Sequence, residues 1–180
     1  MVVCIEMAHG SKFRMLACVD HGFTKPLGIP RFPVCALVAV CQISNQETGR
    51  LNLDTQAVIW LATEPERLSR RAASAIRRAR AADGLSIASI TLLEMAYLFR
   101  RGPLRASGTI EASIRGILET TGASIKEITP EIAALSTQFP DDYSRDPADR
   151  LIGATARAEG LSLVTRDDAI RASALVRTIW

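Results

Sequence analysis

The amino-acid sequence predicts an α/β fold built on a parallel sheet, and two observations support this prediction. Beyond residue 50, short apolar runs alternate in an orderly way with longer segments whose apolar residues recur at helical spacing, a pattern typical of strands joined by helices. Residues that begin or end helices, such as Ser69, Pro147 and Gly84, stand at the junctions. Residues 50–180 are therefore interpreted as one domain.

Each element of this domain is expected from a local signal. Short apolar runs predict strands at 51–53, 85–88, 161–164 and 176–180, and alternation of polar and apolar residues predicts one at 124–128. Helical spacing predicts helices at 55–63, 70–82 after an N-cap at Ser69, 90–101 after an N-cap at Ser89, 109–121, 130–138, 147–159 and a short one opened by 166–168. The sequence contains no internal repeat and no low-complexity segment.

Residues 1–49 differ from the rest, because glycine and proline punctuate them and little periodicity is visible. Two hypotheses describe this N-terminal extension. It is an ordered accessory segment that packs the apolar run 33–43 on the domain, or it is loosely ordered or a consequence of translation starting after Met1. We favour the second hypothesis.

Composition limits the class of protein. Of 180 residues, 48% are hydrophobic and 23% are charged, which is typical of a globular chain. The net charge of +3 permits an acidic partner such as RNA without requiring one. The run 33–43 is shorter than the roughly 20 residues of a membrane-spanning helix, and no signal peptide is evident. All four cysteines precede residue 42, so a cytoplasmic location without membrane contact is expected.

Four acidic residues fall where an expected strand ends or where the next helix begins. They are Asp54, Glu94, Asp149 and Asp167. In an open parallel sheet, the carboxyl ends of the strands and the helices that leave them border one crevice. Residues far apart in the sequence can therefore converge there.

Clustered carboxylates have a specific chemical meaning. They repel one another and raise each other's pKa, and a divalent cation such as Mg²⁺, which prefers oxygen ligands and keeps several waters, removes that conflict. Such waters can supply an attacking hydroxide, while the metal stabilises the charge that develops on a phosphodiester. The pattern predicts phosphodiester hydrolysis.

The segments that carry these acids resemble the four successive motifs of the PIN family, most closely its VapC-like toxin branch. They read LNLDTQAVIWLAT, SIASITLLEMAYLFRRG, SRDPADRLIGATARAEG and LSLVTRDDAIR. Each motif alone is weak, but four in order at suitable spacing are a strong signal. The resemblance covers residues 50–180.

The resemblance implies a three-layer α/β/α fold and a Mg²⁺- or Mn²⁺-dependent endoribonuclease that acts as the toxin of a type II toxin–antitoxin system. It assigns catalysis and metal binding to Asp54, Glu94, Asp149 and Asp167, with Thr165 as a lesser contributor. It also implies a homodimer and a cognate antitoxin protein as partner. The sequence departs from the branch at Gln56, where histidine is frequent, and in its 49-residue N-terminal extension.

Some acidic residues have a purely structural alternative. Asp146 precedes Pro147 and is expected to cap a helix rather than to bind metal, although it remains a secondary candidate. Asp149 could complete a capping box, but its place in the motif favours the metal role. Asp167 and Asp168 compete for one position, and Asp167 is favoured.

Three arginines flank the proposed catalytic acids and are candidates for RNA contact. They are Arg145, Arg150 and Arg166. A second group of arginines lies along the helix expected at 70–82, and a solvated helix face is favoured there over an RNA contact. His9 and His21 are given no catalytic or metal role.

Rival functions lack their motifs. A haloacid-dehalogenase-like phosphatase needs a second aspartate where Gln56 stands, and a phosphoacceptor receiver domain needs an acidic pair and a late lysine. Neither a dinucleotide-binding loop nor a phosphate-binding loop is present. The alternative that remains is non-enzymatic, a degenerate PIN module that binds RNA or a protein partner without cleavage.

Overall fold

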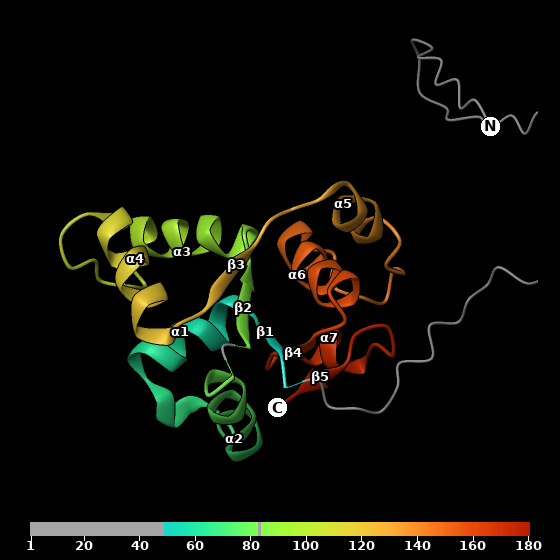
Figure 1. Ribbon diagram of the computed structural model, residues 1–180. Coiled ribbons are helices and arrows are strands. Elements are labelled where there is room, and N and C mark those ends of the chain that lie inside the picture. The colour runs from blue at the N-terminus through green and yellow to red at the C-terminus, as the bar shows by residue number, and fades with distance from the viewer. Residues whose placement is uncertain (1–48, 83) are drawn as a thin grey trace, which may run out of the picture. The chain divides into compact units, whose positions relative to one another are not determined.

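The computed structural model describes residues 49–82 and 84–180, so the hypotheses about residues 1–48 lie outside the described part. Within that part the sheet has five parallel strands in the order β3-β2-β1-β4-β5 (Figure 1). The strands are β1 (Leu51–Leu53), β2 (Leu85–Ala88), β3 (Ser124–Lys126), β4 (Ser162–Val164) and β5 (Thr178–Ile179). The predicted parallel sheet is confirmed.

The helices follow the order expected from the sequence. They are α1 (Thr55–Thr63), α2 (Arg70–Arg80), α3 (Ile90–Arg101), α4 (Ile110–Thr121), α5 (Pro130–Ser136), α6 (Pro147–Ala158) and α7 (Asp168–Ala172), with the short 3₁₀ helix η1 (Pro65–Arg67) between α1 and α2. Most begin at a residue whose side chain accepts from a first-turn N–H, as Ser69 accepts from Ala72 at the start of α2. None of the described helices is long and apolar enough to cross a bilayer.

The sheet separates two hydrophobic cores, and together with the helices it forms three layers. Alternate residues of a strand point to opposite faces, so Leu53 and Ile87 join the core beneath α1 and α2, whereas Leu163 joins the core beneath α5 and α6. Figure 1 shows α1 and α2 on one side of the strands and α5 and α6 on the other. The expected three-layer α/β/α fold is confirmed.

Several expected boundaries differ from the structure. Ser89 stands at the predicted N-cap position of α3, but its backbone is already helical at φ −60° and ψ −27° and its side chain caps nothing. Its N–H donates to the Lys126 carbonyl at 2.8 Å and so continues the β2–β3 ladder. The edge strands β3 and β5 are shorter than the strands expected at 124–128 and 176–180, since only one neighbouring strand pairs with each.

Tyr143 packs its ring into the core beneath α6. The ring stacks on Phe139 with centroids 4.1 Å apart, and its hydroxyl is buried without a hydrogen-bond partner among the described residues. Gly153 on α6 makes room for this ring, because a Cβ at that position would overlap the Tyr143 hydroxyl and approach Phe139 Cζ at 3.0 Å. The glycine is therefore required by packing, despite its low helix propensity.

This contact predicts the effect of Gly153→Ala. The added methyl group overlaps the Tyr143 hydroxyl, and overpacking of this kind costs about 1–3 kcal/mol. We expect the free energy of unfolding in urea to fall by that amount.

Tyr143→Phe is the matched control. It removes a buried, unpartnered hydroxyl, so stability should stay constant or rise by about 1 kcal/mol. In the double variant the Tyr143→Phe change should recover part of the stability lost through Gly153→Ala. Equal losses with and without the hydroxyl would show that the overlap is not the cause.

Candidate active site

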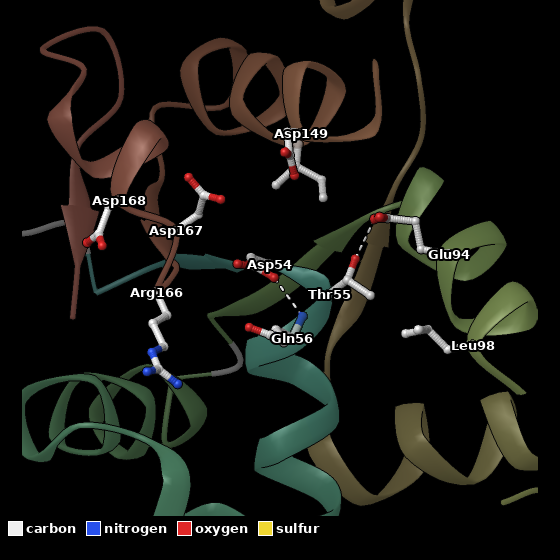
Figure 2. A pocket seen from close by; sticks show the side chains of 10 residues that line it. Asp54, Thr55, Gln56, Glu94, Leu98, Asp149, Arg166, Asp167 and Asp168 are labelled. Carbon is white, nitrogen blue, oxygen red and sulfur yellow. Dashed lines mark hydrogen bonds between the residues drawn. The ribbon is translucent and has the colours of Figure 1, made fainter. Parts of the chain in front are cut away.

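A pocket of about 500 Å³ opens where the carboxyl ends of β1 and β4 meet α3 and α6. The four acidic residues expected to converge all line it (Figure 2). Its full described lining comprises Asp54, Thr55, Gln56, Glu94, Leu98, Asp149, Ile152, Arg166, Asp167 and Asp168. The parallel sheet thus brings together residues from four separate segments of the chain.

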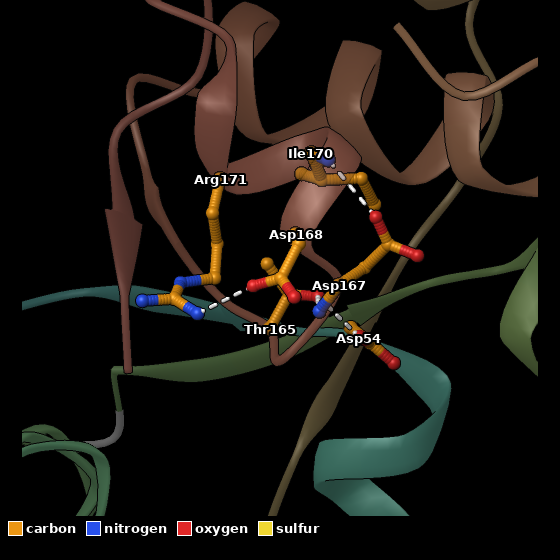
Figure 3. Close-up of polar contacts among 6 residues, drawn as sticks. All are labelled: Asp54, Thr165, Asp167, Asp168, Ile170 and Arg171. Carbon is orange, nitrogen blue, oxygen red and sulfur yellow. Dashed lines mark hydrogen bonds and ion pairs between the residues drawn. The ribbon is translucent and has the colours of Figure 1, made fainter.

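Asp54 lies at the centre of the pocket, between β1 and α1. Its Oδ1 accepts from the Gln56 N–H at 2.6 Å and caps α1, while its Oδ2 accepts from the Thr165 hydroxyl at 2.6 Å. Thr165 is fully buried at the end of β4, and Figure 3 shows its hydroxyl directed at Asp54. Both carboxylate oxygens are therefore fixed in place by the protein.

Glu94 reaches the pocket from α3. Its Oε2 accepts from the Thr55 hydroxyl at 2.6 Å, and the Thr55 hydroxyl also lies 3.3 Å from that of Thr91. Thr55 and Thr91 are both buried, so this contact joins the first turns of α1 and α3. The carboxylate is held in the pocket and does not turn into open water.

Asp149 lies in the first turn of α6 and enters the pocket from a different helix than Glu94 (Figure 2). Its Oδ2 accepts from the Ser144 hydroxyl at 2.6 Å. Ser144 belongs to the loop before α6, and its backbone carbonyl accepts from Arg150 Nε at 2.8 Å. The loop and the helix therefore fix Asp149 together.

Asp167 and Asp168 differ in their contacts. Asp167 caps α7 by accepting from the Ile170 N–H at 2.9 Å through Oδ1, and its own N–H donates to the Thr165 hydroxyl at 3.0 Å. Asp168 is exposed and pairs with Arg171 at 2.8 Å. Figure 3 shows the Asp168 carboxylate turned toward that arginine.

Burial and mutual repulsion shape the charge of the pocket. Burial raises the pKa of Asp54, and the nearby Asp167 adds to this, although hydrogen bonds from Thr165 and Gln56 act in the opposite direction. Burial likewise raises the pKa of Glu94 and Asp149, and neighbouring carboxylates add to the rise in both. These three carboxyl groups therefore bind protons at a higher pH than ordinary aspartate and glutamate side chains do.

Four carboxylates meet in one pocket and repel one another. Their oxygen atoms are the type of ligand that a hard divalent cation prefers. Within residues 49–82 and 84–180, however, no three acidic, histidine or cysteine side chains are grouped tightly enough to enclose a bare ion. Mg²⁺ keeps several waters when it binds proteins, so wider spacing remains compatible with it. Asp54, Glu94, Asp149 and Asp167 are the residues that could hold such a hydrated ion.

The arginines expected to contact RNA divide into three cases. Arg166 lines the pocket, whereas Arg145 is exposed outside it. Arg150 donates to the carbonyls of Ser144, Phe139 and Pro140 at 2.8–3.1 Å. These contacts give the half-buried Arg150 a role in holding the loop before α6, and its contact with RNA stays a prediction.

The structure also separates capping residues from pocket residues. Asp146 caps α6 by accepting from the Ala148 N–H at 2.9 Å and is absent from the described pocket lining. The hydroxyls of Thr55 and Ser144, which hold Glu94 and Asp149, were not predicted from the sequence. The role of Thr55 could have been predicted from its position, because it follows Asp54 directly after β1 and therefore lies at the same edge of the sheet.

Comparison with known proteins identifies the family. A family model described as the PIN domain matches residues 52–174. Ribonuclease VapC22 of Mycobacterium tuberculosis (strain ATCC 25618 / H37Rv) is 35% identical over 133 residues, which cover 71% of this chain and 96% of that protein.

Two solved structures share the fold. VapBC2 from Rickettsia felis, bound to a DNA fragment from its promoter, superposes with a TM-score of 0.55 at 14% identity, over 71% of this chain and 96% of that chain. DNA-bound VapBC from Salmonella typhimurium gives 0.54 at 20% identity, over 72% and 96%.

The chain belongs to the PIN domain family. Within the family it is VapC-like, as its identity with the mycobacterial relative shows.

The raised pKa values predict how stability depends on pH. The folded, metal-free chain keeps protons on Asp54, Glu94 and Asp149 at a pH where the unfolded chain has lost them. Their contribution to stability is therefore full below the ordinary carboxyl pKa, near pH 4, and is lost as the pH rises through the raised values. In EDTA, Asp54→Asn should raise the melting temperature more at pH 7 than at pH 4.

Asparagine is a good N-cap, so this substitution should keep the start of α1 intact. Asp141→Asn, at an exposed position outside the pocket, is the matched control and should leave the pH dependence unchanged. An identical pH profile in wild type and Asp54→Asn would contradict the assignment.

Proposed function

We propose that this protein is a metal-dependent endoribonuclease that hydrolyses RNA phosphodiester bonds as the toxin of a toxin–antitoxin pair. The observation that carries the proposal is the convergence of Asp54, Glu94, Asp149 and Asp167 in one pocket of a PIN domain. The relative that is 35% identical is named a ribonuclease, which supports the same activity.

The four carboxylates would hold one or two Mg²⁺ or Mn²⁺ ions. A bound ion supplies an acidic water and stabilises the charge that develops on the phosphate. The Thr165, Thr55 and Ser144 hydroxyls keep three of the carboxylates oriented before the ion binds, so little side-chain reorganisation is needed. In the reaction a water oxygen bonds to phosphorus, the bond to the leaving oxygen breaks, and that oxygen takes up a proton.

Arg166 would contact the phosphate of the RNA. It lines the acidic pocket and forms no ion pair within the described part of the chain, so its five N–H donors are available to phosphate oxygens. Arg145 would contact a neighbouring phosphate of the RNA strand, since it is exposed in the loop before α6.

Two protein partners are part of the proposal. The two structures with the same fold are VapBC assemblies, and the resemblance to VapC-like toxins implies a cognate antitoxin and a homodimer. The antitoxin would silence the enzyme by occupying the acidic pocket. Light scattering on the purified chain would measure the number of copies in solution.

RNA cleavage is the direct test. Purified protein with Mg²⁺ should cleave a mixed RNA pool, and Asp54→Asn should slow cleavage by at least about a hundredfold, because a metal contributes several kcal/mol to the transition state. EDTA should abolish the activity. Cut sites mapped by primer extension would then define the target.

Asp141→Asn is again the control and should cleave like the wild type, since it lies outside the pocket. Intact RNA from folded protein, with Mn²⁺ and several RNA types also tried, would favour the alternative of a PIN module that binds RNA or a protein without cleavage. Cleavage that survives both EDTA and Asp54→Asn would contradict the metal mechanism.

Metal binding can be measured without catalysis. A ligand that binds only the folded chain at a hundred times its Kd stabilises it by about 2.7 kcal/mol, so saturating Mn²⁺ should raise the melting temperature of the wild type. Glu94→Gln should reduce this rise. The effect should weaken at acidic pH, because protons compete with the metal for carboxylates of raised pKa.

A further inference from the structure

A second, differently charged pocket lies at the amino-terminal end of the sheet. It has a volume of about 330 Å³ and lies between α2 and the strands β1, β4 and β5. Its described lining comprises Gly49, Leu51, Arg71, Ala75, Arg78, Ser162, Arg177 and Ile179. Leu51 and Ser162 begin their strands, whereas the acidic pocket lies beyond the strands' carboxyl ends.

The sheet register explains how these residues meet. Leu51 pairs with Ser162, and Val164 pairs with Ile179, so alternation along each strand places Ser162, Arg177 and Ile179 on the same face as Leu51. That face is the one covered by α2. Arg71, Ala75 and Arg78 stand four and three residues apart on α2 and therefore share one side of the helix.

The pocket is cationic, and within the described part of the chain no acidic side chain pairs with its arginines. It is lined by three arginines and, among the described residues, by no aspartate or glutamate. No salt bridge in the described part of the chain involves Arg71, Arg78 or Arg177. Arg78 donates only to the neutral Ser74 hydroxyl, at 2.9 Å.

The floor of the pocket is apolar. Leu51, Ala75 and Ile179 line it between the arginines. A volume of about 330 Å³ lies at the lower end of the range for small-molecule sites. Guanidinium groups bind phosphate oxygens through paired N–H donors, and an apolar floor suits the flat face of a sugar or base.

We propose that this pocket binds the phosphate of a nucleotide-sized ligand through Arg71, Arg78 and Arg177. The phosphate belongs either to a free nucleotide or to one unit of an RNA strand, and the chemistry of recognition is the same. The site is separate from the acidic pocket, and its occupation does not depend on cleavage or on a divalent metal.

Binding is measured on the full chain in EDTA at low salt, so that the outcome is independent of nuclease activity. The probes are adenosine 5′-monophosphate, the nucleoside adenosine as a phosphate-free control, and a fluorescently labelled six-nucleotide RNA. Arg71→Ala, Arg78→Ala or Arg177→Ala should each weaken binding of the monophosphate about tenfold, as expected for loss of a charged hydrogen bond.

Arg70→Ala is the matched control, because Arg70 is exposed on the same helix and absent from the described lining. It removes the same charge and should change affinity less than about twofold. Circular dichroism and thermal melting confirm that each variant is folded. The affinity of Arg78→Lys for the monophosphate should lie between those of the wild type and Arg78→Ala. Lysine keeps the positive charge but lacks the paired N–H donors of the guanidinium group.

The labelled RNA distinguishes the two sources of phosphate. If the monophosphate displaces the RNA, and RNA binding depends on the same three arginines, the ligand is an RNA strand. Binding of the monophosphate without such displacement supports a free nucleotide. The proposal is overturned if the monophosphate binds more weakly than about 10 mM, if adenosine binds equally well, or if Arg70→Ala weakens binding as much as the pocket variants do.

Discussion

The 2.6 Å hydrogen bond from the Thr165 hydroxyl to Asp54 joins the carboxyl ends of β1 and β4, which are 111 residues apart in sequence. It forms because the two strands are parallel neighbours that end at the same edge of the sheet. Thr165 also accepts from the Asp167 N–H, so one buried hydroxyl sets the positions of two acidic residues. The remaining carboxylates are arranged around this fixed pair.

The acidic pocket lies on the boundary between the two hydrophobic cores. Glu94 comes from α3, where Met95 belongs to the core beneath α1 and α2, whereas Asp149 comes from α6, where Ile152 belongs to the core beneath α5 and α6. Each of these carboxylates accepts from a hydroxyl on a neighbouring segment, Thr55 for Glu94 and Ser144 for Asp149. The geometry of the pocket thus depends on how the two cores pack against the sheet.

The sequence predicted the sheet, the order of helices and the acidic set, because strand ends and helix starts carry local signals that do not depend on distant contacts. It did not reveal contacts that form only when the chain is folded. The backbone N–H of Ser89 is bonded to β3 and its side chain caps nothing, and Arg150 binds carbonyls of the preceding loop. The orienting hydroxyl of Ser144 and the buried phenol of Tyr143 left no periodic pattern from which they could be inferred.

The two ends of the sheet carry opposite charge, with carboxylates around one pocket and arginines around the other. The charges of the two pockets therefore form a dipole that is aligned with the strands, with its positive end at their amino ends. A polyanion that diffuses toward the protein is drawn to the arginine end and repelled from the carboxylate end. At the carboxylate end a bound divalent cation would cancel part of the negative charge of the four carboxylates and so weaken the repulsion of a phosphate. In the proposed nuclease, the acidic pocket would therefore repel an RNA phosphate more strongly before the metal binds than after it.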